Sequence, residues 1–510
     1  MGRRLHALKG NLSNLFKGKG VLDLYNNDQL AHTNSSTSRQ QKRKLILPTD
    51  VLIEIFSHLE DDYKTLQSCV LVNRIWCENS VPSLWAQPFL DLTPSTIIDV
   101  YLTCLTEPER NYLIDNDIIG IPNRRRVPAF DYVSFLRHLS MGSLYSIVQR
   151  WTDRTQTKYS VSPKRHNPFN AEPSLLYSVT FTGLGLSIHY ITDWSIFGYL
   201  SKYAKNIETL EVIDYSFNQA PHPEDEQNLA SLISIQNNLR HIKLFGYSTY
   251  PALTLTSLGS QANSLISVEI IYVHFISNQP STSTTSTSTS SIMRSTLEGL
   301  ANCVNLEELI IKNCSFATDE ILAPLICANF PKLRKIHIVE STYGWDSVVV
   351  SLIQNNPTHL EEVYYKPVDN QQLHIISPTI IEAVAQNCPK IIRLGVPIAK
   401  IQISHLIDIL TSSECKLKSL SIFRMDRISW DDEALWKDLG SLMPVTLRHL
   451  NIWIYIGDTP MQLFLQNTTA PLETLYVRWW THYLGYDCHL VGAYLKDKPV
   501  KISDFLRHIL

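Results

Sequence analysis

The chain has 510 residues, of which 44% are hydrophobic and 18% charged, and its 45 basic and 48 acidic side chains give a net charge of −3. This length allows more than one domain, and the near balance of charge argues against bulk electrostatic capture of nucleic acid, so we expect no nucleic-acid partner. The nine cysteines form no C-x-x-C pair, which argues against a disulfide framework and a zinc site and favours a reducing compartment, cytoplasmic or nuclear. No stretch approaches 18 consecutive apolar residues, so we expect no transmembrane helix.

Residues 1–46 differ in composition from the rest of the chain. Five basic residues precede the first acid, Asp23, and leucines lie between them. A basic amphipathic segment of this kind can contact an anionic membrane or act as a targeting signal. The polar run HTNSSTSRQQKRK that follows favours a solvated, disordered arm instead, and this is the interpretation we adopt, with membrane contact as the alternative.

Residues 47–90 place two apolar helical stripes in a segment that is too short to form a large core of its own. Pro48 stands at a first helical turn. The residues that follow it have the spacing of an amphipathic helix, with apolar side chains at Val51, Leu52, Ile55, Phe56 and Leu59. So much apolar surface on so short a segment predicts a partner, either another chain or the rest of this one.

The order LP-x-D-V-L-x-x-I-F-x-x-L, then L-V-N-R-x-W, then V-P-x-L-W resembles an F-box. The resemblance implies three helices that dock on a Skp-type adaptor, which in turn is carried by a cullin in SCF-type ubiquitin ligases. The residues that match the motif, and that it implies as adaptor-binding or helix-forming, are Leu47, Pro48, Val51, Leu52, Ile55, Phe56, Leu59, Val72 and Trp76. The alternative is an ordinary helical hairpin buried in the main domain.

Residues 91–205 carry no family motif. The segment from Phe130 to Trp151 has helical spacing, and we expect Gly183-Leu184-Gly185 to form a turn, because it lacks the third glycine of a phosphate loop. We predict that residues 91–205 supply connecting helices and degenerate first repeats.

Residues 206–510 repeat a template that is apolar at its first, fourth and sixth positions. The first positions are Ile207, Leu239, Leu265, Leu306, Leu333, Leu360, Ile391, Leu417, Leu447 and Leu472. One interval, of 41 residues, is longer than the others and contains the tract STSTTSTSTSS, so we predict a disordered insertion at residues 278–292.

The spacing resembles leucine-rich repeats, in which each unit supplies one strand and one helix. Cys314 stands at the ninth template position, where such repeats take Asn or Cys, and we expect it to be buried. Thr318 and Ser377-Pro378 have the form of helix starts. The predicted fold class is therefore α/β: a three-helix F-box followed by a leucine-rich-repeat solenoid, a horseshoe of parallel strands and outer helices.

Together the two segments resemble an F-box and leucine-rich-repeat protein of fungal type, the substrate receptor of an SCF ligase. The resemblance implies a non-catalytic subunit with a protein substrate, and the absence of GxSxG, HExxH and Walker motifs agrees with this. We expect no cofactor and no metal. The alternative is a leucine-rich-repeat scaffold without a ligase role, which its basic arm could attach to a membrane.

Template positions three, five and seven alternate with the buried positions and should line the concave face of the solenoid. Aromatic residues gather at these positions in the last repeats, a composition that favours protein interfaces. We therefore predict that Phe423, Trp453, Tyr476 and Arg478 bind the substrate.

Overall fold

The computed structural model describes residues 47–89, 93–115, 128–159, 184–189, 195–213, 223–246, 252–273, 297–314, 319–341, 345–356, 359–368, 379–424, 430–454 and 456–477. The chain divides into residues 1–52 and residues 53–510. The predicted arm at 1–46, the predicted insertion at 278–292 and Arg478 lie outside the described residues.

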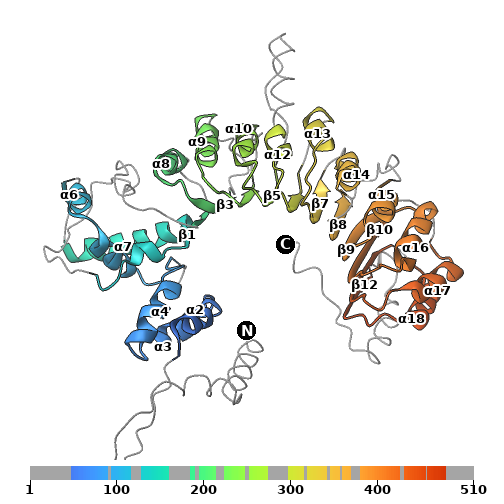
Figure 1. The fold of residues 1–510 in the computed structure, drawn as a ribbon, viewed down its shortest axis with the longest axis horizontal. Coiled ribbons are helices and arrows are strands. Elements are labelled where there is room, and N and C mark those ends of the chain that lie inside the picture. Colours follow the sequence, from blue (N-terminus) through green and yellow to red (C-terminus); the bar gives the residue numbers. More distant parts are fainter. Residues whose placement is uncertain are drawn as a thin grey trace, which may run out of the picture. The chain divides into compact units, whose positions relative to one another are not determined.

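A parallel sheet of twelve strands occupies the second unit, and its strands lie side by side in the order in which they occur in the chain (Figure 1). The strands are β1 (His138–Ser140), β2 (Leu184–His189), β3 (Ile207–Ile213), β4 (His241–Phe245), β5 (Ser267–Ile271), β6 (Glu308–Lys312), β7 (Lys335–Ser341), β8 (Glu362–Pro367), β9 (Arg393–Ile398), β10 (Ser419–Arg424), β11 (His449–Trp453) and β12 (Thr474–Val477). In-order parallel pairing is typical of a solenoid, in which each repeat contacts only its neighbours.

The repeat template explains why these segments form strands. In β3 the first, fourth and sixth positions, Ile207, Leu210 and Val212, are fully buried. The fourth positions also lie in register, so that Leu210 pairs with Ile242 and Ile242 with Val268. Alternating burial of this kind gives each strand one face against the core. The predicted α/β fold of parallel repeats is confirmed.

Helices connect the strands and lie along one face of the sheet (Figure 1). They are α8 (Ser195–Tyr203), α9 (Pro223–Ser234), α10 (Ala252–Ser257), η4 (Leu258–Gln261), α12 (Glu298–Ala301), α13 (Asp319–Ile326), α14 (Trp345–Asn355), α15 (Thr379–Asn387), η5 (Lys400–Gln402), α16 (Ile403–Thr411), α17 (Glu433–Leu442) and α18 (Asp458–Asn467). Their apolar sides join the strands in one core, to which α14 contributes the buried Trp345, Val348 and Leu352. The helices expected after Thr318 and Ser377-Pro378 are α13 and α15.

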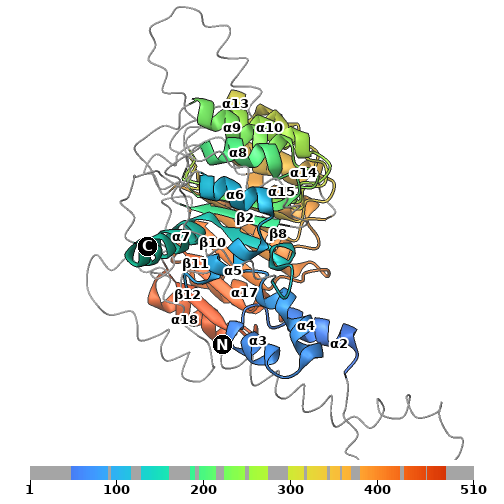
Figure 2. The ribbon, with the colours of Figure 1, turned by 90° about the vertical axis from the view of Figure 1, so that its left-hand side faces the viewer.

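The F-box region forms three helices, α2 (Thr49–Ser57), α3 (Tyr63–Val70) and α4 (Arg74–Leu84), and Figure 2 shows α3 and α4 next to each other. Two short polar side chains fix where α3 and α4 begin. The Asp62 carboxylate accepts a hydrogen bond from the Thr65 amide at 3.1 Å, and the Asn73 side chain accepts one from the Trp76 amide at 3.0 Å. Each cap satisfies an amide that the helix itself leaves without an acceptor.

The end of α4 is joined to the beginning of the sheet. The connecting segment contains α5 (Ile97–Cys104), α6 (Glu107–Asp115) and η1 (Tyr132–Phe135), and α7 (Met141–Tyr159) follows β1 in the chain, before β2. The ring of Trp85 packs against Tyr101 and Tyr132, with centroid distances of 5.7 and 4.2 Å. The Ala86 carbonyl accepts hydrogen bonds from the amides of Arg137 and His138, at 2.9 and 3.0 Å, and His138 is the first residue of β1. Aromatic packing and backbone bonds thus connect α4 to the first strand.

The eighth template position turns the chain away from the strand in four consecutive repeats. Gly246, Tyr272, Asn313 and Glu340 all have positive φ, between 51° and 82°. Glycine and asparagine adopt this conformation readily, whereas tyrosine and glutamate do so at a cost. Neighbouring contacts hold the two unfavourable residues in place: the Tyr272 ring packs on Phe245, and Glu340 pairs with Lys366.

Two strands, β1 and β2, lie in the segment without a template. The turn predicted at Gly183-Leu184-Gly185 is wrong for its last two residues, which begin β2. Gly185 is needed there because a Cβ atom at this position would lie 2.9 Å from Nδ1 of His138 on β1. The glycine marks a close approach of two strands, which a single sequence does not distinguish from a turn.

Candidate functional site

The interior of the F-box region holds two residues that the motif implies as adaptor-binding. Leu52 and Phe56 are 1% and 0% exposed. The Phe56 ring packs edge-on against Trp76 of α4, with a centroid distance of 5.5 Å. Both side chains therefore belong to the interior of the region in this conformation, and the adaptor contact predicted for them stays a prediction.

Other large apolar side chains of the region point into solvent. We define the F-box apolar set as Ile53, Tyr63, Leu71, Val72 and Ile75. Each of these five is exposed, and they lie on α2, α3, α4 and the α3–α4 turn. Leu71 and Val72 are 85% and 57% exposed. Large apolar groups gathered on so few residues are typical of a surface that a partner covers.

The remaining residues of the predicted adaptor site divide by exposure. Pro48 and Val51 are exposed, as is Val72, while Leu47, Ile55, Leu59 and Trp76 are partly buried. Sequence reasoning did not include Ile53, Tyr63, Leu71 and Ile75. The available signal for Leu71 was the apolar run Val70-Leu71-Val72 just before the Asn73 cap, in the turn between α3 and α4.

The second candidate surface is the sheet face opposite the helices. We call it the open face and define it by template positions three, five and seven of β3 to β12. Neighbouring strands in register place these positions beside one another, as in the pairs Glu211–Lys243 and Ser421–Asn451. The open face therefore consists of rows of side chains that run across the strands.

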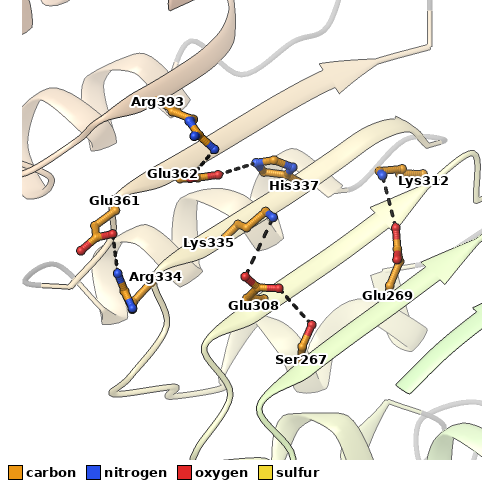
Figure 3. A network of polar contacts seen from close by, with 10 residues as sticks. All are labelled: Ser267, Glu269, Glu308, Lys312, Arg334, Lys335, His337, Glu361, Glu362 and Arg393. Carbon is orange, nitrogen blue, oxygen red and sulfur yellow. Dashed lines mark hydrogen bonds and ion pairs between the residues drawn. The ribbon is translucent and has the colours of Figure 1, made fainter. Parts of the chain in front are cut away.

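Ion pairs between neighbouring strands occupy the open face from β3 to β9, and Figure 3 shows those between β5 and β9. The Nζ atom of Lys243 lies 2.7 Å from Glu211, that of Lys312 3.3 Å from Glu269, and that of Lys335 4.0 Å from Glu308. On β8 and β9, Arg393 donates to the Glu362 carboxylate at 2.8 Å. Each of these acids has a basic neighbour on the next strand, which neutralises this part of the face.

His337 lies half-buried in the middle of this network. Burial, together with the cations Lys335, Lys312 and Arg393, lowers the pKa of His337 to about 3. The Glu362 carboxylate lies 3.4 Å from His337 Nε2, but Arg393 already neutralises that carboxylate. His337 is therefore uncharged at neutral pH, and we assign it a packing role.

A row of aromatic rings crosses the open face from β8 to β12. The Tyr364 ring contacts Phe423 at a centroid distance of 5.6 Å, Phe423 contacts Trp453 at 6.0 Å, and Trp453 contacts Tyr476 at 5.1 Å. The Lys366 ammonium lies 4.8 Å from the centre of the Trp453 ring. We call Tyr364, Phe423, Trp453 and Tyr476 the aromatic row.

Gly395 makes the row continuous. Tyr364 is on β8 and Phe423 on β10, and a Cβ atom at Gly395 on β9 would lie 2.3 Å from the Tyr364 ring. Only glycine lets the ring pass over the intervening strand. Burial raises the pKa of Tyr364 to about 12, so its hydroxyl stays protonated, and the hydroxyl is hydrogen-bonded to Ser421.

The structure brings three of the four predicted substrate-binding residues together. Phe423, Trp453 and Tyr476 are consecutive members of the aromatic row, whereas Arg478 lies outside the described residues. Phe423 is only 5% exposed and supports its neighbours in the row, and its predicted contact with a substrate stays a prediction. Tyr364 was not among the predicted site residues, although a glycine at the fifth position of the next template was a signal for it.

Three buried thiols are not suited to act as nucleophiles. Burial raises the pKa of Cys303, Cys314 and Cys388 to about 12, so these thiols stay protonated at neutral pH. Cys314, at the ninth template position, is buried as expected. Within the described segments, no group of three or more His, Cys, Asp or Glu residues could hold a metal ion, and no described helix is long and apolar enough to cross a membrane.

Comparison with known proteins identifies one part of the chain. Residues 45–91 match the model of the F-box-like family, so the chain contains an F-box-like domain that includes α2, α3 and α4. No curated protein matches the chain. Among solved structures, the chain is similar to one described as the crystal structure of a Rad7 and Elc1 complex in yeast, with 13% identity over 91% of this chain and 100% of that chain. The TM-score of 0.40 is too low to support an inference about function.

Proposed function

We propose that this chain is the substrate-recognition subunit of an SCF-type ubiquitin ligase. In this proposal the F-box-like domain binds a Skp-type adaptor, which links the chain to a cullin, and the open face binds a protein substrate. The chain has no catalytic role of its own and acts by holding the substrate near a separate conjugating enzyme. Its location would be the cytoplasm or the nucleus.

One observation carries the proposal: the segment that matches the F-box-like family also bears the F-box apolar set. Full burial of a large apolar side chain contributes about 1.5–3 kcal/mol. The exposure of Leu71 and Val72 in the free chain is therefore unfavourable, and an adaptor that covers them would gain this free energy on binding.

Co-purification with a Skp-type adaptor tests the proposal. We expect the full-length chain to capture the adaptor. The double variant Leu71→Asp/Val72→Asp should bind the adaptor more than tenfold more weakly, because two buried apolar contacts are replaced by desolvated carboxylates. Its melting temperature should change little, since both side chains are exposed in the free chain.

A matched control exists in the repeats. Ile401 and Val445 are 87% and 68% exposed, close to the values for Leu71 and Val72. The variant Ile401→Asp/Val445→Asp should therefore bind the adaptor as the wild type does. Equal capture by both double variants would contradict adaptor binding through the F-box apolar set. Failure of the wild type to capture any Skp-type adaptor would favour a repeat-based scaffold without a ligase role.

A further inference from the structure

The chemistry of the open face changes between β9 and β10. Every strand from β3 to β9 bears at least one charged side chain on this face, and ion pairs connect them. On β10, β11 and β12 the described residues at positions three, five and seven include no Asp, Glu, Lys or Arg. They are Ser419, Ser421, Phe423, His449, Asn451, Trp453, Thr474 and Tyr476. Within the bounds of these strands the charged residue is Arg424, at the eighth position of β10, and Lys418, Arg448 and Glu473 each stand one residue before a strand, at the second template position.

Four polar side chains of this end are bonded to one another in pairs. The Asn451 amide donates to the Ser421 hydroxyl at 3.0 Å, and His449 Nδ1 lies 2.9 Å from the Thr474 hydroxyl. An asparagine amide has two N–H groups and a carbonyl oxygen, and this bond uses one N–H. Side chains of this kind suit the N–H and C=O groups of a peptide backbone better than a formal charge.

The charges next to the aromatic row are already compensated. Lys366 forms an ion pair with Glu340 and lies over Trp453, and Arg393 is paired with Glu362. An acidic or phosphorylated segment would have to separate these pairs to gain a partner. A basic segment would meet no carboxylate on β10 to β12. Charge complementarity therefore favours an uncharged ligand.

The size of the aromatic row fits a short extended chain. The row spans five neighbouring strands, which at a spacing of 4.7–4.9 Å covers about 19 Å. An extended peptide rises about 3.3 Å per residue, so about six residues match this length. Partly buried rings of Tyr and Trp provide rigid apolar contact area with few rotatable bonds.

We propose that the β10–β12 end of the open face, together with Tyr364, binds an extended, uncharged substrate segment that carries bulky aromatic or aliphatic side chains. The inference rests on the proposed function, because it names the class of substrate segment that the receptor recognises. Trp453 and Tyr476 contact the bulky side chains of the segment, and Asn451 pairs with its backbone.

A random peptide library displayed on phage and selected against the purified full-length chain tests this assignment. We expect the enriched sequences to contain at least one aromatic or large aliphatic residue and to be depleted in Asp, Glu, Lys and Arg. Synthetic peptides from the selection should bind Trp453→Ala and Tyr476→Ala at least tenfold more weakly in fluorescence anisotropy. Tyr272→Ala, a matched change of an exposed tyrosine at the end of β5, should leave their affinity unchanged.

Two results would overturn the assignment: enrichment of acidic or basic peptides, or equal losses in Tyr272→Ala and Tyr476→Ala. If Trp453→Ala does not fold, Tyr476→Ala alone gives the decisive comparison, with its fold checked by circular dichroism. Adaptor capture is measured on the same preparations. Retained capture with no peptide preference contradicts only this inference, whereas loss of capture by the wild type contradicts the proposed function.

Discussion

His337 illustrates how neighbouring side chains determine the protonation of a single residue. The pKa of about 3 in the folded chain lies below the ordinary value of 6.5. Between these two pH values the unfolded chain binds a proton that the folded chain does not bind. The folded state therefore loses stability as the pH falls through this window, and the contribution of His337 is complete only above pH 6.5.

We predict that lowering the pH from 7.5 to 5.5 destabilises the wild type more than His337→Gln, by about 1 kcal/mol, since glutamine has no proton to bind. Thermal unfolding of both proteins at the two pH values measures the difference. An equal decrease in melting temperature for wild type and variant would show that His337 can be protonated in the folded chain.

At the residue scale, the sequence predicted the F-box but not which of its side chains face outward. The spacing from Val51 to Leu59 defines an apolar stripe on a helix. It does not show which part of the stripe the region buries in its own interior and which part it presents to a partner. Leu52 and Phe56 are buried and Leu71 is exposed because of how the helices pack, and that packing depends on contacts distant in sequence, such as Phe56 with Trp76.

At the scale of elements, β9 is the strand that allows the aromatic row to form. Gly395→Ala would place a methyl group 2.3 Å from the Tyr364 ring, so the ring must leave its position against Phe423. Overpacking of this kind typically costs about 1–3 kcal/mol. We expect a lower melting temperature and weaker binding of peptides selected on the aromatic row.

A double-mutant cycle checks the cause of this loss. In a Tyr364→Ala background no ring opposes the new methyl group, so the additional change Gly395→Ala should cost little. If Gly395→Ala destabilises both backgrounds equally, the glycine is required for the backbone of β9 and not for the passage of the ring.

The strands divide into those that the template revealed and those that it did not. Ten segments with apolar residues at positions one, four and six became β3 to β12, because positions four and six place two side chains on the same buried side of the strand and position one is buried at or just before its start. β1 and β2 keep only part of the pattern. In β2, Leu186 and Ile188 are buried, but the first template position falls on Gly183. Pairing with β3 compensates for the incomplete pattern, and a single sequence does not reveal such pairing.

On the scale of the whole molecule, the sheet is continuous across the longest interval between repeats. β5 and β6 pair in register, with Val268 beside Leu309 and Ile270 beside Ile311. In a solenoid, stability is roughly the sum of each repeat and its contacts with its two neighbours.

We therefore predict that deleting Ser281–Ser290 changes the melting temperature little and leaves adaptor capture intact. Closing a flexible loop costs only about 0.6 kcal/mol more for each doubling of its length, so shortening it has a small effect. Differential scanning calorimetry of wild type and deletion variant measures the change. A large destabilisation would mean that the segment is structural and that the repeat pattern across it was assigned wrongly.

The pairing of charges on the open face also has a kinetic consequence. The five acids Glu211, Glu269, Glu308, Glu340 and Glu362 are matched by five bases, Lys243, Lys312, Lys335, Lys366 and Arg393. A face with this balance exerts little long-range attraction on an approaching protein, so encounter proceeds at the unsteered rate of about 10⁵–10⁶ M⁻¹s⁻¹ and depends weakly on salt. Discrimination between partners must then reside in how long each one stays bound, which short-range contacts with the rings of Trp453 and Tyr476 determine.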